Sequence, residues 1–237
     1  MGDFFILNKF GITPSKNYTA AGYDFYIPNV VETDEMRELI FDAFMASYKI
    51  KTREEMEFIY NQLAFNVSAY ECLFFEGAFN DKTSLNILHL YLASNQQKNF
   101  TEGSIERFVT NRLIFDKNGV PGMKVETGDY FLFNSGIKVK LIEDTAGIFF
   151  NKSGKGNQGF DVRACVVDED YAGFVHMSSA YDKRFDTVLY CGDKFTQMVI
   201  VPVVKTQIIE VDDDKFVDLH LDSKRGADGF GSSDVKH

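Results

Sequence analysis

The chain has 237 residues and a formal net charge of −10; 45% of its residues are hydrophobic and 25% are charged. The length suits one domain, or one domain with a large insertion, and the composition excludes a wholly disordered or fibrous chain. The negative charge, with no basic cluster, argues against direct binding of nucleic acid. No apolar run approaches the roughly 18 residues of a membrane span, and no basic leader of a signal peptide stands at the N-terminus.

The cysteines are few and isolated. Cys72, Cys165 and Cys191 are odd in number, far apart and never in a CxxC pair, and the four histidines form no HExxH motif. This pattern disfavours a disulfide framework or a zinc knuckle. It predicts a reducing compartment, the cytoplasm.

The pattern of residues changes twice along the chain. Residues 1–30 alternate aromatic and β-branched runs with Gly and Pro, which predicts strands and turns. Residues 31–123 show apolar residues at helical spacing, in four segments: Met36 to Tyr48, Met56 to Leu63, Leu85 to Leu92, and Ile105 to Val109. We therefore expect a helical subdomain of this stretch, with a modest core of its own.

The second of these helices has a start signal. Thr52 and Glu55 stand three residues apart before the apolar positions, as in a capping box. We expect the helix to begin directly after Thr52.

From Met123 to about Leu221 short apolar runs again alternate with Gly and Asp turns. Residues 137–141 alternate as a half-buried strand does, and many short strands favour a sandwich or barrel. Residues 224–237 are rich in Gly, Ser and charge, which predicts a mobile C-terminal arm.

Five segments carry unusual combinations of Gly, charged and aromatic residues: 20–25, 151–156, 166–173, 192–197 and 225–233. Each alone is typical of a turn or linker. The segment around Ser153 and Gly154 lacks the Walker A spacing, and no helix clearly follows it, so a glycine-rich turn between strands is the plain interpretation. Asp168, Glu169 and Asp170 alone suggest a solvated acidic turn.

In this order, the five segments resemble the motifs of the trimeric dUTPase family. The resemblance depends on Gly-Tyr-Asp-Phe at 22–25, Lys-Ser-Gly at 152–154, Asp-Glu-Asp-Tyr-Ala-Gly at 168–173, Gly-Asp-Lys-Phe-Thr-Gln at 192–197, and Arg-Gly at 225–226 with Gly-Phe-Gly-Ser-Ser at 229–233. It covers residues 1–30 and 124–237. Residues 31–123 stand as an insertion after the first motif.

The resemblance implies a mainly β fold, a dUTPase-like jelly roll or β-barrel with an α-helical insertion subdomain. It also implies an enzyme, a dUTP diphosphatase that hydrolyses dUTP to dUMP and pyrophosphate with Mg²⁺. The ion is held mainly by the substrate phosphates rather than by protein ligands, as hard cations prefer oxygen. A homotrimer with sites shared between subunits follows from the family, and so does location in the cytoplasm, that of the host if the source is a phage.

The resemblance also assigns residues. Asp168 would orient and deprotonate the attacking water, and the Tyr171 ring would pack under the deoxyribose and exclude a ribose 2′-hydroxyl. The backbone from Asp161 to Val167 would read uracil. Asp24 is expected to support its neighbours rather than to catalyse. Phosphate and base contacts would come from Lys152, Ser153, Gly154, Gln197, Arg225, Phe230, Gly231, Ser232 and Ser233, with Arg225 on the γ-phosphate and Phe230 stacked on uracil.

Departures from the family pattern leave alternatives open. Lys152 and Lys194 replace arginines, which keeps the charge but loses the bidentate fork. Cys165 and Arg163 replace small residues and would affect the choice of base. The alternatives are a deoxynucleoside triphosphatase of altered base specificity, and a nucleotide-binding regulatory protein whose helical insert binds a protein partner. A dCTP deaminase of the same superfold is disfavoured by Asp168 and Tyr171.

Overall fold

The computed structural model describes residues 3–31, 33–74, 83–94, 100–183 and 185–219. The chain divides into two compact units, Met1–Val203 and Val204–His237. The strands of the first unit are β1 (Phe5–Asn8), β2 (Tyr23–Tyr26), β3 (Leu113–Phe115), β4 (Pro121–Val125), β5 (Tyr130–Lys140), β6 (Thr145–Asn151), β7 (Phe160–Val162), β8 (Val166–Val167), β9 (Phe174–Tyr181), β10 (Thr187–Tyr190) and β11 (Lys194–Pro202). Its helices are α1 (Asp34–Tyr48), α2 (Arg53–Phe74), α3 (Ser84–Ser94), α4 (Glu102–Asn111) and α5 (Ser153–Gln158).

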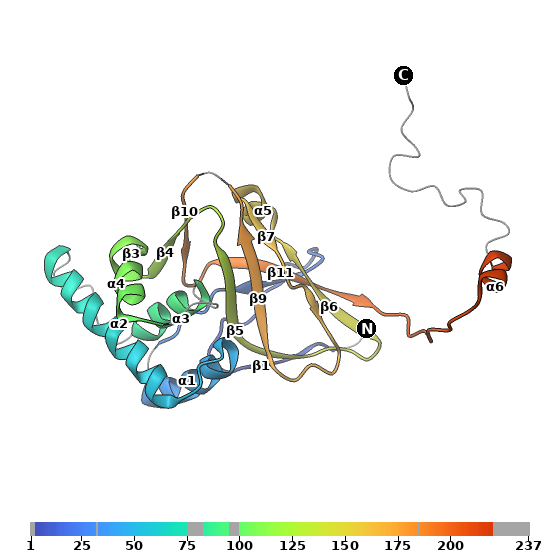
Figure 1. The fold of residues 1–237 in the computed structure, drawn as a ribbon, viewed down its shortest axis with the longest axis horizontal. Coiled ribbons are helices and arrows are strands. Elements are labelled where there is room, and N and C mark those ends of the chain that lie inside the picture. Colours follow the sequence, from blue (N-terminus) through green and yellow to red (C-terminus); the bar gives the residue numbers. More distant parts are fainter. Residues whose placement is uncertain (1–2, 32, 75–82, 95–99, 184, 220–237) are drawn as a thin grey trace, which may run out of the picture. The chain divides into compact units, whose positions relative to one another are not determined.

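The strands form three antiparallel sheets, with the orders β1-β5-β9-β7, β10-β4-β3 and β2-β11-β6-β8. The mainly β fold predicted from the sequence is confirmed. In the described residues the sheets do not close into one barrel, and their arrangement is jelly-roll-like. Helices α1 to α4 gather on one side of the sheets (Figure 1).

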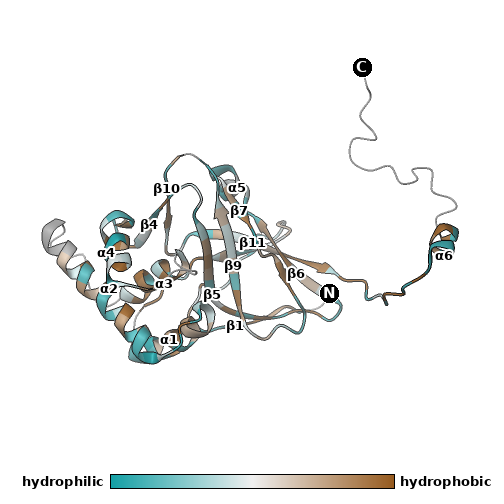
Figure 2. Cartoon of the chain, viewed as in Figure 1, coloured by the Kyte–Doolittle hydropathy of each residue, from teal (hydrophilic) through white to brown (hydrophobic). Residues whose placement is uncertain are grey.

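The four predicted helices are present at the expected positions. In α1, Ile40, Ala43, Phe44 and Tyr48 are buried, so one face packs inward as the spacing predicts. The outer helices also carry teal, hydrophilic stretches (Figure 2).

The capping signal before α2 works in a slightly different way from a capping box. The Glu55 N–H donates to Thr52 Oγ1 at 3.2 Å, so Thr52 caps the helix as expected. The Glu55 carboxylate, however, accepts from the Lys51 N–H at 3.2 Å rather than from the N–H of Thr52.

The range 31–123 is not helical throughout. Strand β3 and most of β4 lie in it, and β4 also pairs with β10, for example Met123 with Leu189. A turn at residues 116–120 joins β3 to β4, and the last helix of the segment ends at Asn111.

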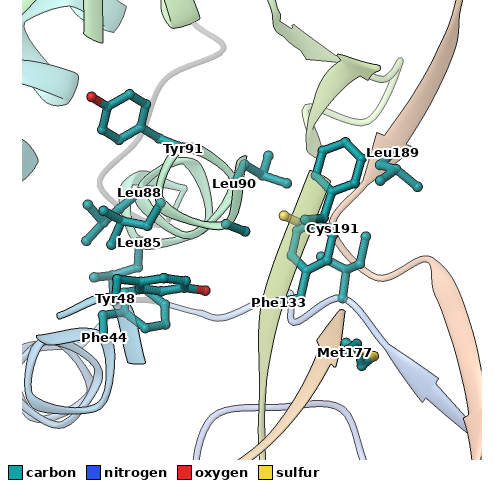
Figure 3. Packing of buried hydrophobic residues seen from close by; sticks show 14 of the residues in the cluster. Phe44, Tyr48, Leu85, Leu88, Leu90, Tyr91, Phe133, Met177, Leu189 and Cys191 are labelled. Carbon is teal, nitrogen blue, oxygen red and sulfur yellow. The ribbon is translucent and has the colours of Figure 1, made fainter. Parts of the chain in front are cut away.

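The sequence predicted a separate core for the helices, and this prediction is wrong. The helices share one continuous core with the sheets. The reason is α3, in which every residue from Ser84 to Ala93 is buried. A helix that is apolar on all sides must be covered on all sides. Figure 3 shows Leu90 on the side of Phe133 and Leu85 on the side of Phe44.

Two buried polar side chains of α3 differ in their hydrogen bonding. Asn86 accepts from the Val30 N–H at 2.7 Å and donates to the Val30 carbonyl at 2.8 Å, so it binds the segment that leads from β2 to α1. His89 is fully buried and stacks on Phe44 with ring centroids 4.9 Å apart. Neither of its ring nitrogens has a hydrogen-bond partner among the described residues.

Helix α1 also completes an edge of a sheet. Strand β1 pairs with β5 only up to Asn8, opposite Ile137. Beyond that point the Tyr48 hydroxyl donates to the Leu132 carbonyl at 2.9 Å and accepts from the Asn134 N–H at 3.4 Å. One tyrosine hydroxyl thus takes the place of a missing strand at the β5 edge.

The second unit contains helix α6 (Asp213–Asp218), whose N-cap Asp212 accepts from the Lys215 N–H at 2.9 Å. Among the described helices of both units, none combines the length and the apolar character that a membrane crossing requires.

Candidate functional site

The hairpin of β7 and β9 opens before it reaches the third motif. The register Asp161 with Ala180 and Val162 with Ser179 continues to Arg163, whose N–H donates to the Ser178 carbonyl at 3.1 Å. The chain then changes partners. The Cys165 carbonyl accepts from the Phe149 N–H at 2.7 Å, and β8 pairs with β6.

This change of partners leaves main-chain groups facing the opening. In the β7–β9 register, Cys165 and His176 would form the next hydrogen-bonded pair, since such pairs alternate along an antiparallel ladder. Because β6 binds Cys165 instead, the N–H and C=O of His176 project into the gap between the strands. A planar ligand with adjacent donors and acceptors would match such a pair of groups.

A cavity of about 240 Å³ occupies this gap. Its walls are mostly apolar, and Asp168 and Tyr171 also line it. The complete lining is Phe149, Ala164, Val166, Val167, Asp168, Tyr171, Val175 and His176. The space therefore suits a small flat group bound through the backbone.

The turn after β8 fixes Tyr171. Its N–H donates to the Asp168 carbonyl at 3.2 Å, and its hydroxyl donates to the Phe174 carbonyl at 2.8 Å. A Cβ at Gly173 would lie 2.4 Å from the Tyr171 hydroxyl, so a glycine is required where the ring closes over the backbone. The Asp168 side chain is exposed, and its carboxylate has no ion-pair partner among the described residues.

A second group of site residues surrounds Asp24. The Asp24 carboxylate pairs with Lys152 through one oxygen and with Lys194 through the other, the latter at 3.0 Å. Burial alone would raise the pKa of Asp24, but hydrogen bonds and charge from both lysines outweigh it and lower the pKa. The same contact raises the pKa of Lys194. Asp24 is thus a fixed anion that positions two ammonium groups.

Short-range contacts hold the rest of this group in place. Gln197 Nε2 donates to the Asn151 carbonyl at 3.0 Å, and Lys155 pairs with Asp193 at 2.9 Å. Ser153 and Gly154 form the exposed first turn of α5, where the sequence had predicted a glycine-rich turn instead of a helix.

The two groups lie toward opposite ends of β6. Val167 pairs with Gly147, whereas Lys152 follows the last residue of the strand. Five residues of extended chain span about 17 Å. Within one chain, Asp168 and Tyr171 are therefore separated from Lys152, Ser153, Gly154 and Gln197.

Comparison with known proteins identifies a family for the chain. The family model described as dUTPase matches residues 115–234. The chain belongs to the dUTPase family. The match begins after the helices α1 to α4, which lie outside it.

Two relatives show the extent of the likeness. Deoxyuridine 5′-triphosphate nucleotidohydrolase of Xanthomonas campestris pv. campestris (strain B100) is 31% identical over 118 residues, which cover 48% of this chain and 74% of the relative. Its counterpart from Xanthomonas oryzae pv. oryzae (strain PXO99A) is 30% identical over 118 residues, 48% of this chain and 72% of the relative.

Among solved structures, a point mutant of the Staphylococcus bacteriophage 80alpha dUTPase with dUpNHpp has a TM-score of 0.50 at 13% identity, with 98% of this chain and 99% of that chain covered. A second structure of that phage dUTPase with dUPNHPP also has a TM-score of 0.50 at 13% identity, with 99% and 100% covered. At this identity the likeness is one of fold, and it extends over the helical segment.

Two dUTPase-family positions that depart from the expected pattern do not line the cavity. Arg163 is half-exposed and pairs with Asp161 at 3.3 Å, and Cys165 packs against the core. Neither residue lines the 240 Å³ cavity.

Ala164 lies in the segment 161–167 that the sequence indicated, whereas His176, Val175 and Phe149 were not indicated as lining residues. They line the cavity because the chain changes strand partners after Arg163, and no local sequence pattern predicts this change. The fifth-motif residues of this dUTPase-family chain, Arg225, Phe230, Gly231, Ser232 and Ser233, lie outside the described residues.

Proposed function

We propose that this protein hydrolyses dUTP to dUMP and pyrophosphate. The observation that carries the proposal is the cavity between β8 and β9, with Asp168 and Tyr171 at its wall, in a chain of the dUTPase family. The relatives named above carry the same activity in their names.

Uracil would enter this cavity and be read by the backbone. The N–H and C=O of His176 would pair with the uracil edge, together with main-chain groups of residues 164–167. Because Arg163 and Cys165 do not line the cavity, their replacement of small residues leaves its space intact. This favours uracil over the altered base specificity that the sequence left open. The Tyr171 ring would lie under the deoxyribose, where a 2′-hydroxyl would collide with it.

Asp168 would act on the water nucleophile. Its exposed carboxylate is not neutralised by a cation among the described residues, so it remains free to accept a proton. The water would attack phosphorus as its O–H bond breaks toward Asp168, and pyrophosphate would leave. Phosphoryl transfer asks little more of a protein than such positioning and neutralisation of charge.

The cations around Asp24 would bind the phosphates. An ammonium group has three donors, so Lys152 can keep Asp24 and still donate to a phosphate oxygen. Ser153, Gly154 and Gln197 would add hydrogen bonds from the same end of β6. We take the substrate to be the magnesium complex of dUTP. We take phosphate oxygens and water to be the main ligands of the ion, because hard cations prefer oxygen.

We propose that the active sites are shared in a homotrimer. The separation of about 17 Å along β6 places the two groups too far apart for easy convergence within one chain. The sheet that carries them also has an uncovered apolar face: Phe150 is 47% and Val166 is 62% exposed. A second copy of the chain would cover this face and bring its own Asp168 toward Lys152. The fifth-motif residues, Arg225 to Ser233, would close over the nucleotide.

The direct test of activity is pyrophosphate release, with Mg²⁺, from dUTP, dTTP, dCTP, dATP and UTP. We expect release from dUTP alone. Release from another base would show altered specificity, and release from none would show a binding protein rather than an enzyme.

The shared site can be tested by mixing two inactive variants, Asp168→Asn and Lys152→Ala, after joint refolding. In shared sites, random assembly restores one intact pairing in about a quarter of the sites. Each variant alone should remain inactive. If the mixture stays as inactive as its components, or light scattering gives a monomer, the shared trimer is wrong.

A further inference from the structure

A line of hydrogen bonds joins helix α1 to strand β9. His176 Nε2 lies 2.9 Å from Ser47 Oγ, and Ser47 Oγ donates its one proton to the Ala43 carbonyl at 2.8 Å. The hydroxyl therefore acts as an acceptor toward the imidazole, and His176 Nε2 is the donor. Ser47 also accepts from Asn134 Nδ2 at 2.9 Å, so its oxygen is anchored from two sides.

The same histidine follows the third motif closely in the chain. Burial lowers the pKa of His176 and the nearby Phe174 backbone offsets this only in part, so the ring is neutral and its one N–H is the Nε2–H that faces Ser47. The Phe174 carbonyl accepts from the Tyr171 hydroxyl at 2.8 Å. The Tyr171 hydroxyl is thus bound to the first residue of β9, two residues before His176.

Helix α1 and the third-motif turn are linked by an aromatic contact as well, because the Phe10 ring packs on Phe44 of α1 at 5.8 Å and on Phe174 at 5.4 Å. A cavity of about 530 Å³ lies between them, with Ala43, Ala46 and Ser47 on the α1 side and Tyr171, Gly173 and His176 on the other. Alanines cannot fill such a gap by packing. The bond from His176 to Ser47 is therefore a direct polar link from α1 across this cavity.

We propose that Ser47 and His176 are positioning residues for the nucleotide site, through which the helical segment fixes the main chain that reads the base and the ring that excludes ribose. The inference rests on the proposed function and extends it. His176 contributes its N–H and C=O to the base cavity, while its side chain is held from α1. A small displacement of the His176 main chain or of the Tyr171 ring weakens binding. Hydrogen bonds to the edge of a planar base require positions accurate to about 0.5 Å.

Ser47→Ala tests the proposal, with Tyr48→Phe as a matched control. Both variants remove hydroxyl hydrogen bonds between α1 and the β5–β9 sheet, but among the described residues the Tyr48 hydroxyl bonds the β5 main chain, at Leu132 and Asn134, and not the His176 side chain. We expect Ser47→Ala to raise the KM for dUTP about three- to tenfold with kcat changed less than about twofold. The preference for dUTP over UTP should fall as well, and Ser47→Thr should restore both values. Tyr48→Phe should leave the preference unchanged.

Ser47→Ala removes the bond from Asn134 as well as the bond from His176. A double-mutant cycle with His176 separates the two effects. His176→Phe should reproduce the effect of Ser47→Ala, and the double variant should show no further loss. Equal losses for Ser47→Ala and Tyr48→Phe, or an additive double variant, would overturn the proposal and leave a structural role.

Binding of dUpNHpp and its ribose counterpart, measured by calorimetry, separates this inference from the proposed function. If the wild-type protein binds dUpNHpp but does not hydrolyse dUTP, the proposed function fails while the affinity ratio still judges Ser47. If the wild-type protein hydrolyses dUTP and Ser47→Ala keeps the wild-type ratio, only the positioning role fails. A wild-type protein that binds neither analogue overturns both.

Discussion

His89 should make the stability of this protein depend on pH in a range where most proteins vary little. Burial, with a smaller contribution from His176, lowers the pKa of His89 to about 3. In the unfolded chain a histidine titrates near pH 6.5. The folded state therefore holds His89 neutral. The contribution of neutral His89 to the free energy of unfolding is fully present above about pH 6.5. It is lost as the pH falls toward the pKa of His89 in the folded state, because in this range only the unfolded chain takes up the proton.

The magnitude follows from the two pKa values. Between about pH 8 and pH 5, proton uptake by the unfolded state lowers the free energy of unfolding by about 2 kcal/mol for this one residue. Carboxylates contribute little in this range, since their unfolded pKa values lie near 4. The change His89→Leu should abolish this dependence. At pH 8 its net effect should be small, because relief of about 1–3 kcal/mol from the unpaired nitrogens opposes the lost stacking on Phe44.

The assay is urea unfolding at matched protein concentration, for the wild-type chain and His89→Leu, at several pH values from 5 to 8. His176 and the surface groups are present in both proteins and cancel in the difference. We expect the two stability curves to converge at pH 8 and to separate by about 2 kcal/mol at pH 5. Parallel curves would refute the reasoning and show that His89 is hydrated or paired.

The remaining predictions concern the site. Asp168→Asn should lower kcat/KM about 10²- to 10⁴-fold and retain affinity for dUpNHpp in calorimetry, since the shape is kept while the base is lost; loss of binding would make Asp168 structural. Phe230→Ala, or deletion from residue 224 onward, should lower kcat/KM at least about tenfold with an unchanged melting temperature. An unaltered kcat/KM in the truncated chain would contradict the closing role of the arm.

Local patterns in the sequence predicted the helices well. The apolar spacing from Met36 to Tyr48 and the cap at Thr52 are short-range features, and the structure confirms both. The third-motif turn is equally local, because Gly173 and Tyr171 stand two residues apart and require each other.

The strand pairing could not be predicted in the same way. Residues 164–167 leave β9 for β6, and this exchange is decided by Phe149, which lies far from them in the sequence. The cavity and the exposed main chain of His176 follow from that exchange. Likewise, α3 is buried on every side by residues from other elements, and the sequence of α3 alone does not show which elements these are.

The Tyr48 hydroxyl at the β5 edge has a consequence for protein engineering. A designer who excises only the helices α1 to α4, which the family model does not match, would leave the Leu132 carbonyl and the Asn134 N–H without the Tyr48 hydroxyl. The same cut would strip the cover from Phe133 and from the Val30 main chain that Asn86 binds. The shortened protein would expose an unpaired strand edge to which other chains can bind. We therefore expect it to aggregate into inclusion bodies rather than to fold as a smaller enzyme. The helices therefore protect the edge of the sheet from other chains, and the first unit should unfold in a single cooperative step.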